Sequence, residues 1–381
     1  MTKRILPFAL VAIALLYTIA PYFFEKVFFL NEVLALVGFL LLAGNRFTLA
    51  RSPLNWALMA FMMLCALHTV TSVFRADSVY LFLRNSVIFY SAFSFFVGYF
   101  LYLYFDVFFK RLGVVIGGYV TSLLFFPVSH LVYDRFSVSV LFPLVASKSP
   151  RHLVLLVLAA MAALYSVFHE SSTSLILTGL FILLFVVRSY FVFATVIGVG
   201  LVLAGIGFAW LVSDLAIDSS RYSYYNEVGI WELISRRDLF RLDPNTTWRL
   251  VLWKQLLVDQ FPANLLGIGF GTPALQFFPI EDYDKLSTLP YVLGGHNSFV
   301  YLFCRLGLLF LGIFACLYHF VFSYFFQLRA EMDSKSFFYL LAFLSISTVA
   351  LFNPVLETPV YASVFWIALG LVSRSIETSK N

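Results

Sequence analysis

The sequence predicts an all-α polytopic membrane protein of about twelve transmembrane helices, interrupted by one large loop. Of the 381 residues, 61% are hydrophobic and only 12% are charged, whereas a soluble globular domain is about a quarter charged. Apolar runs of roughly 18 residues or more recur along the whole sequence. The first run follows Lys3 and Arg4. It lacks a small-x-small cleavage site and further spans come directly after it, so we interpret it as a span rather than a cleaved signal.

The apolar runs define the expected elements in order. The first nine are expected at Ile5 to Ala20, Val27 to Gly44, Leu54 to Val73, Ser86 to Phe105, Leu112 to Ser129, Phe136 to Ala146, Leu153 to Phe168, Thr173 to Val187 and Tyr190 to Val212. The last three are expected at Ser298 to Phe322, Phe337 to Phe352 and Val360 to Val372. The sixth run is short, so a full span and a re-entrant segment both stay open there. The predicted parts are an N-terminal transmembrane bundle (1–213), a large loop with short helices (214–297) and C-terminal transmembrane helices (298–381).

The basic residues predict how these spans are oriented, because cytoplasmic loops of membrane proteins are enriched in Lys and Arg. With a cytoplasmic amino terminus, most basic loop residues lie inside, and the short outside loops hold only Lys26, Arg75, Arg135 and the boundary residue Arg84. We therefore expect both termini to be cytoplasmic and the 214–297 loop to lie on the outer face. The same rule explains the net charge of +5, and without a basic patch we expect no nucleic-acid partner.

The composition also limits the cofactor chemistry. The three cysteines, Cys65, Cys304 and Cys316, are scattered through apolar runs, so they form neither a disulfide framework nor a zinc pattern. The Gly-x-Gly-x-Gly segment that starts at Gly267 has no preceding strand and no Gly-Lys-Ser/Thr ending, so it is not a nucleotide loop. We interpret it as a flexible, tightly packed turn, and we expect neither a metal nor a cofactor.

Ionisable residues collect at the predicted outer ends of the spans. Arg75 with Asp77, and Asp134 with Arg135, can be salt bridges or interfacial anchors. Arg84 lies at the start of an apolar run, where an ionisable group normally faces the bundle interior or a watery cavity. It can also extend its guanidinium outward to the interface, and both interpretations stay open.

The large loop contains a predicted amphipathic helix at the membrane surface, from Trp248 to Leu257. Asn245 or Thr246 can cap its first amides. Arg249 and Trp253 are four residues apart and therefore share a face. A planar guanidinium suits the paired oxygens of a diphosphate. An interfacial anchor helix with a solvated Arg249 is the alternative.

The loop closes on Gly294-Gly295-His296-Asn297-Ser298, directly before an apolar helix. His296 is one of only six histidines in the chain. Histidine has an unperturbed pKa near 6.5 and can take a proton from an attacking hydroxyl near neutral pH, and two glycines before it would let a substrate come close. A hydrogen-bonded interfacial histidine is the alternative. No second His or Cys lies near it, which argues against a metal site.

Together these residues resemble the O-antigen ligase and O-antigen polymerase superfamily of bacterial surface-polysaccharide enzymes. Three blocks, covering about a third of the chain, carry the resemblance. They are Trp248-Arg249-x3-Trp253 with Pro262 and Gly267-x-Gly269-x-Gly271, Gly295-His296-Asn297-Ser298 with Leu302, Leu306-Gly307 and Leu311-Gly312, and Glu357-x-Pro359 with Phe365-Trp366 and Leu369-Gly370. A weaker similarity lies in Ser171-Ser172-Thr173-Ser174.

The resemblance implies a membrane glycosyltransferase on the periplasmic side of the bacterial inner membrane, metal-independent and inverting, whose donor is a glycan on undecaprenyl diphosphate. It implies that His296 activates the acceptor hydroxyl and that Arg249 holds the donor diphosphate. Arg84 and Arg135 are further candidates for binding the anion or the sugar. Asn297, Trp253 and Glu357 are expected to support the site. A chain-length regulator or flippase of the same pathway would be a partner.

The chain departs from the family pattern at two positions. Where relatives often carry an arginine in a Ser-Arg-Thr block, this chain has Ser172, so one diphosphate-binding arginine is missing or supplied elsewhere. Where relatives often carry a glutamate nine residues after the histidine, it has Arg305. Nine helical residues put Arg305 on roughly the opposite face from His296 and about 13 Å deeper. We expect it to pair with another buried group or to lie along the lipid path, not to be catalytic.

Three functions follow from these features. The first is polymerisation of lipid-linked repeat units into a surface polysaccharide. The second uses the same donor but ligates the glycan to lipid A-core. The third is a transporter or flippase, which would carry functional charges at the bilayer midplane. The visible charges lie mostly at the outer ends of the spans, which favours an outward-facing enzyme.

Overall fold

The computed structural model describes residues 29–44, 49, 51–104, 186–213, 249–250, 252–274, 294–328 and 334–379, with a few positions between 176 and 184. The spans expected at 5–20, 112–129, 136–146 and 153–168 lie outside these residues, as do Arg135 and most of the 214–297 loop. Within the described ranges, the regular elements are all helical and none is a strand. The class expected from the sequence is confirmed for this part of the chain.

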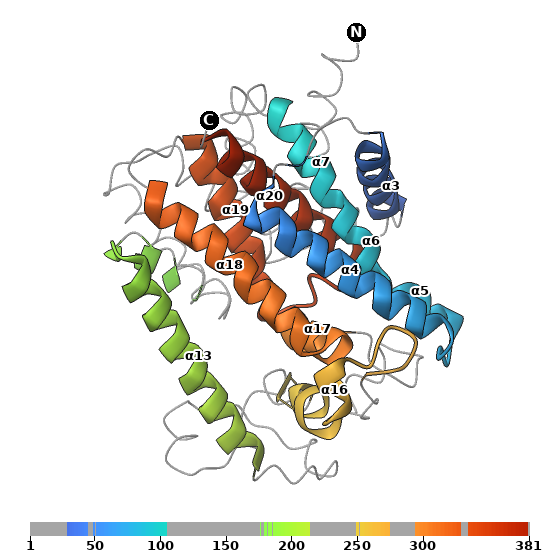
Figure 1. The fold of residues 1–381 in the computed structure, drawn as a ribbon. Coiled ribbons are helices and arrows are strands. Elements are labelled where there is room, and N and C mark those ends of the chain that lie inside the picture. The colour runs from blue at the N-terminus through green and yellow to red at the C-terminus, as the bar shows by residue number, and fades with distance from the viewer. Residues whose placement is uncertain are drawn as a thin grey trace, which may run out of the picture.

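The helices form a bundle of long, roughly antiparallel rods (Figure 1). Their bounds are α3 (Phe29–Ala43), α4 (Pro53–Val73), α5 (Val79–Asn85), α6 (Val87–Tyr90), α7 (Ser94–Leu101), α13 (Tyr190–Ser213), α16 (Ala263–Leu266), α17 (Ser298–Leu306), α18 (Leu308–Leu328), α19 (Ser334–Ala350) and α20 (Pro359–Thr378). Two 3-10 turns, η1 (Ser91–Phe93) and η2 (Tyr102–Tyr104), flank α7, and a π-helical turn, η5, spans Gln255–Asp259.

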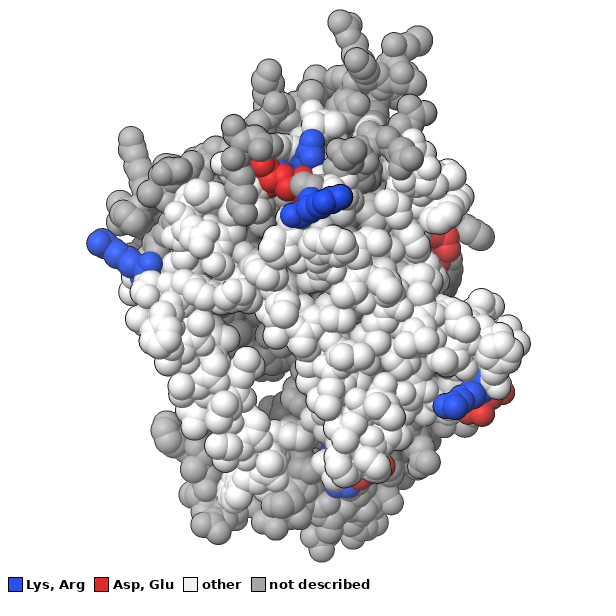
Figure 2. Space-filling view, in the orientation of Figure 1, with Lys and Arg blue, Asp and Glu red and all other residues white. Residues whose placement is uncertain are grey.

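Several of these helices are long and apolar enough to cross a membrane. In the described ranges there are four, at Pro53–Val73, Val79–Leu101, Tyr190–Trp210 and Leu308–Leu328, and the helices around Asn31–Ala43 and Ser336–Ala350 are shorter and apolar. In the view of Figure 2, charged side chains are few and leave a broad uncharged band between them. These features agree with a membrane protein, since charges are costly in lipid. The count of twelve spans and their orientation stay predictions.

Two predicted boundaries were wrong. The fourth expected span begins at Val79 rather than Ser86, so Arg84 lies inside a helix and not at its start. The span expected from Ser298 to Phe322 is broken at Gly307, where the backbone φ is 80°. A Cβ added at Gly307 would lie 2.6 Å from the backbone oxygen of Leu265. The chain breaks there because another backbone segment crosses it closely, and α17 becomes a separate short helix.

Close helix packing holds the bundle together. Helix α20 lies against α7 and α19, and α4 lies against α18. Glycines allow the closest approach: an added Cβ would lie 2.1 Å from the Ile367 oxygen at Gly98 and 2.1 Å from the Phe95 oxygen at Gly370. Small residues serve this purpose in membrane helices, where dispersion contacts replace the hydrophobic effect.

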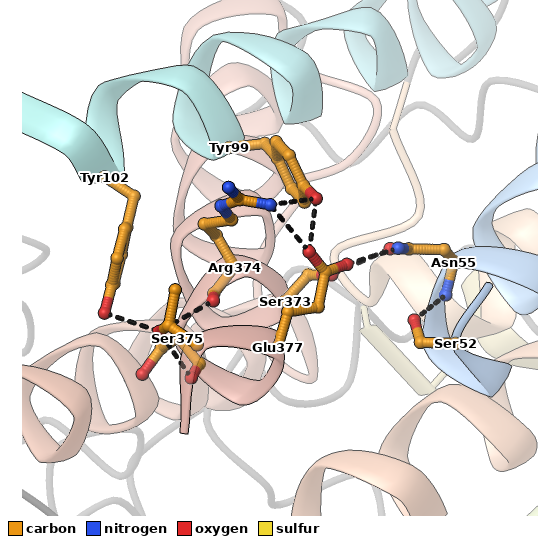
Figure 3. A network of polar contacts seen from close by, with 9 residues as sticks. Ser52, Asn55, Tyr99, Tyr102, Ser373, Arg374, Ser375 and Glu377 are labelled. Atoms are coloured by element: carbon orange, nitrogen blue, oxygen red, sulfur yellow. Dashed lines mark hydrogen bonds and ion pairs between the residues drawn. The ribbon is translucent and has the colours of Figure 1, made fainter. Parts of the chain in front are cut away.

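A polar network ties three helices together at the carboxyl-terminal end of α20 (Figure 3). Asn55 of α4 donates to Glu377 Oε1 at 2.7 Å. Arg374 donates to the Tyr99 hydroxyl of α7 at 2.8 Å and to Glu377 Oε2 at 3.0 Å. Ser373 donates to Asn55 Oδ1 at 2.7 Å. Because these side chains provide hydrogen-bond partners for one another, we interpret the network as structural.

Candidate functional site

The loop before α17 gives His296 an unusual backbone. Asn297 is the N-cap of α17, and its side-chain oxygen accepts from the amides of Phe299 and Val300 at 3.0 and 3.1 Å. His296, one residue earlier, has a φ of +50° and is the one non-glycine residue with positive φ among those the structure describes. Left-handed residues of this kind are uncommon and are concentrated at functional sites.

The glycine before His296 serves packing. A Cβ added at Gly295 would lie 2.9 Å from Leu256 Cδ1 and 3.2 Å from Tyr301 Cβ. The expectation that both glycines admit substrate therefore needs correction at Gly295, which instead lets the loop lie directly on the helix that carries Arg249. Trp253 of that helix donates through Nε1 to the Gly295 carbonyl at 2.9 Å.

Arg249 lies close enough to His296 for its charge to act on the imidazole. Burial of the imidazole, and then the nearby positive charge of Arg249, lower the pKa of His296 from 6.5 to about 4. Burial disfavours the charged form of an imidazole, and so does a neighbouring cation. His296 is therefore neutral at neutral pH and has a lone pair with which to accept a proton.

The helix that carries Arg249 packs on protein with its apolar side. Leu252 and Leu256 are fully buried in the core, and the π-helical turn that follows contacts α17. Asn264 donates its amide to the carbonyls of Leu256 and Leu257 at 2.8 and 3.1 Å, which satisfies groups at the end of this helix. The predicted segment is helical in its described positions, and its buried leucines lie on the side that packs against protein. Its position at the membrane surface stays a prediction.

A buried carboxyl group supports the start of α17. Glu357 is 1% exposed, and its Oε2 accepts from the Ser298 hydroxyl. Ser298 Oγ in turn accepts from the amides of Val355 and Leu356 at 2.8 and 3.0 Å. Burial raises the pKa of Glu357 from 4.5 to about 7, and the Ser298 hydrogen bond and the charge of Arg84 offset part of that rise. The supporting position predicted for Glu357 thus lies directly behind the His296 loop.

Arg84 points into the protein and contacts the same region. Its Nη1 donates to the backbone carbonyl of Glu357, and its side chain is half-buried. This favours the interior interpretation of Arg84 over the outward one.

The glycine block is a packing device between α4 and α17. Gly267 and Gly269 have φ of 90° and 78°, and a Cβ at Gly269 would lie 2.4 Å from Ser72 Oγ. The amide of Gly269 donates to the Arg305 carbonyl at 3.0 Å, and Arg305 Nη1 donates back to the Gly269 carbonyl at 2.9 Å.

Arg305 is 1% exposed and also donates to the Thr272 carbonyl and the Tyr301 hydroxyl, at 2.6 and 2.8 Å. Arg305 therefore pairs with buried groups. This is one of the two arrangements expected for it from the sequence.

Sequence reasoning missed some members of the site. Ser298 joins α17 to Glu357 and to the turn before α20. From the sequence we placed it in the block with His296 but assigned it no role in the site. Among the described residues, no three His, Cys, Asp or Glu side chains lie together as metal ligands.

No protein-family model, curated protein or solved structure matches this chain.

Proposed function

We propose that this chain is a membrane glycosyltransferase that polymerises undecaprenyl-diphosphate-linked repeat units into a surface polysaccharide on the periplasmic face of the inner membrane. The observation that carries the proposal is the effect of Arg249 on His296: the charge of Arg249 acts on a half-buried imidazole whose backbone φ is positive. A base next to a cation is what transfer from a lipid diphosphate needs, because the acceptor must lose a proton and the leaving group is an anion.

In the proposed reaction, His296 takes the proton of the acceptor hydroxyl while that oxygen attacks the anomeric carbon of the donor sugar. The bond between this carbon and the diphosphate oxygen breaks, and the electron pair leaves with the diphosphate. Attack opposite the leaving group inverts the anomeric configuration. Arg249 stabilises the departing diphosphate through paired hydrogen bonds.

The low pKa of His296 implies an order of steps, in which the donor binds before the acceptor loses its proton. An imidazolium beside Arg249 is unfavourable while the site holds no anion, since like charges repel. The negative charge of a bound diphosphate would offset Arg249 and strengthen the base. The donor therefore completes the site before the acceptor is deprotonated.

The remaining predicted residues hold the pair in place. Trp253 links the Arg249 helix to the His296 loop, Asn297 caps α17, and Glu357 fixes its first turn through Ser298. Fixed supporting contacts of this kind preorganise a site. Arg135 stays a candidate for the donor anion or sugar.

Ligation to lipid A-core is the close alternative, because it uses the same donor and base and differs only in the acceptor. A transporter or flippase is a third possibility. Along α20 the charged groups Glu357, Arg374 and Glu377 lie near its two ends and not at its middle, and this supports an enzyme.

The products of the purified protein test the proposal. We would supply lipid-linked repeat units with and without lipid A-core and separate the products by size. We expect long glycans on the lipid carrier in both reactions. Transfer to core alone would establish the ligase instead, and no change in the donor under either condition would contradict a glycosyltransferase.

A further inference from the structure

A second group of polar side chains lies where the start of α3 meets the end of α6. Tyr90 at the end of α6 donates its hydroxyl to Glu32 Oε1 in the first turn of α3, at 2.9 Å. Glu32 is exposed and Tyr90 is half-buried. The second carboxylate oxygen and the face of the ring are thus available to a ligand.

Arg84 flanks the same tyrosine. Its charge and that of Glu32 both act on the Tyr90 phenol. The guanidinium makes one hydrogen bond, to the Glu357 carbonyl, and in the part of the chain that is described the two ion pairs are Lys254–Asp259 and Arg374–Glu377. Glu32 and Arg84 therefore lie around one phenol without neutralising each other.

The base of this group is a buried, hydrogen-bonded side chain. Asn31 is 1% exposed, and its Oδ1 accepts from the hydroxyls of Ser91, at 3.1 Å, and Ser363. These bonds join α3 to η1 and α20. The side chain of Asn31 also interacts with the Tyr90 hydroxyl. The Tyr90 hydroxyl is therefore positioned by two groups of α3, Asn31 and Glu32.

The chemistry of the group selects its ligand. A carboxylate accepts hydrogen bonds from hydroxyls, a guanidinium donates to hydroxyl and ring oxygens, and an aromatic ring covers the apolar face of a sugar. A diphosphate would be repelled by Glu32, and a metal cation by Arg84. An uncharged ring with neighbouring hydroxyls can bridge the two charges without adding a third.

We propose that Glu32, Tyr90 and Arg84 form a binding subsite for the acceptor sugar, which is a neutral pyranose. This inference rests on the proposed function and names the substrate class of the same site. Arg84 links the subsite to the reaction centre, because it contacts Glu357, which holds Ser298 at the start of α17, two residues after His296. The acceptor would thus lie between this group and His296, while the donor diphosphate is held by Arg249.

The test separates acceptor binding from donor binding. Purified protein in nanodiscs receives lipid-linked repeat units as donor and, as acceptor, the neutral oligosaccharide released from one repeat unit by mild acid. We expect Glu32→Ala to raise the acceptor KM by about tenfold, the equivalent of one lost hydrogen bond to a charged group. Tyr90→Phe should raise it too, because Glu32 loses the hydroxyl that positions its carboxylate. The donor KM should stay unchanged in both variants. Tyr102→Phe is the matched control, because it removes a hydroxyl contact of similar length, to Thr378, near the other end of α20. An unchanged acceptor KM in both variants would overturn the subsite.

A binding measurement keeps this result distinct from the proposed function. Saturation-transfer NMR would detect the same oligosaccharide on the wild-type protein and on Glu32→Ala, which changes an exposed residue. Binding that is lost in Glu32→Ala supports the subsite even if no transfer occurs. Equal binding by both proteins, or by neither, overturns the subsite while leaving activity that depends on His296 untouched.

Discussion

The role proposed for His296 depends on its residue type and on its neighbours in the folded chain. Only the residue type can be read from the sequence. Its residue type and position predicted a base at a membrane boundary, and Arg249 was predicted as an anion ligand in the same loop. Arg249 lies 47 positions before His296 in the chain, and in the structure its charge acts on the imidazole. The positive φ of His296 and the Ser298–Glu357 contact were not predictable. The Ser298–Glu357 contact depends on the turn before α20, which is far away in the sequence.

The pH dependence of turnover should reflect this pairing. Because the pKa of His296 is lowered to about 4, the acid limb of kcat/KM, which reports the free enzyme, should lie near pH 4. An unperturbed histidine would place it near pH 6.5. Arg249→Gln removes a charge that lowers this pKa, so the limb should move to higher pH. Rates measured between about pH 3 and 8 check this, and an identical limb in both proteins would contradict an electrostatic role for Arg249.

Most of the described helices lie where the apolar runs predicted them, whereas the break of a helix within such a run was not predictable. The periodic apolar runs identified α4 and α13 almost to the residue. The sequence did not predict the break at Gly307, because a glycine inside an apolar run is compatible with a continuous helix. What breaks it is the backbone at Leu265, which only the folded chain brings there. The network around Glu377 was also not predictable from the sequence, because its members come from three helices that only folding brings together.

The glycine block offers a test of its packing role. Gly267→Ala should lower the thermal midpoint by several degrees, since φ is +90° and the new Cβ would lie 2.6 Å from the Arg305 oxygen. The cost should exceed about 1 kcal/mol. Gly312→Ala in α18 is the matched control, because nothing lies within 4 Å of its Cβ. Thermal unfolding in detergent compares the two, and equal midpoints would show that the block is free to move.

Over the whole molecule, α20 separates two polar regions. Its 20 residues correspond to about 30 Å of helix, the thickness of the hydrocarbon core. Glu357 lies just before its first residue and contacts Ser298, which follows the His296 loop, and the Glu377 network lies at its end (Figure 3). A helix of this length would place the two regions at opposite faces of a membrane, and the positive-inside rule predicts that the His296 loop lies on the outer one.

Reporter fusions test this arrangement. A reporter near residue 240 should report the periplasm, and one at the carboxyl terminus should report the cytoplasm, because the basic loops predict that orientation. A cytoplasmic signal from the residue 240 fusion would contradict the outward-facing site.

The rate of glycan transfer by His296→Ala is the decisive measurement. With purified protein and lipid-linked donor, we expect transfer to fall by about 10²-fold to 10⁴-fold, the usual contribution of a general base, while donor binding and thermal stability stay close to wild type. His319→Ala is the matched control, because His319 bonds Tyr190 across α13 and α18, away from the α17 loop. It should keep its activity. Full transfer by His296→Ala would show that the base lies elsewhere.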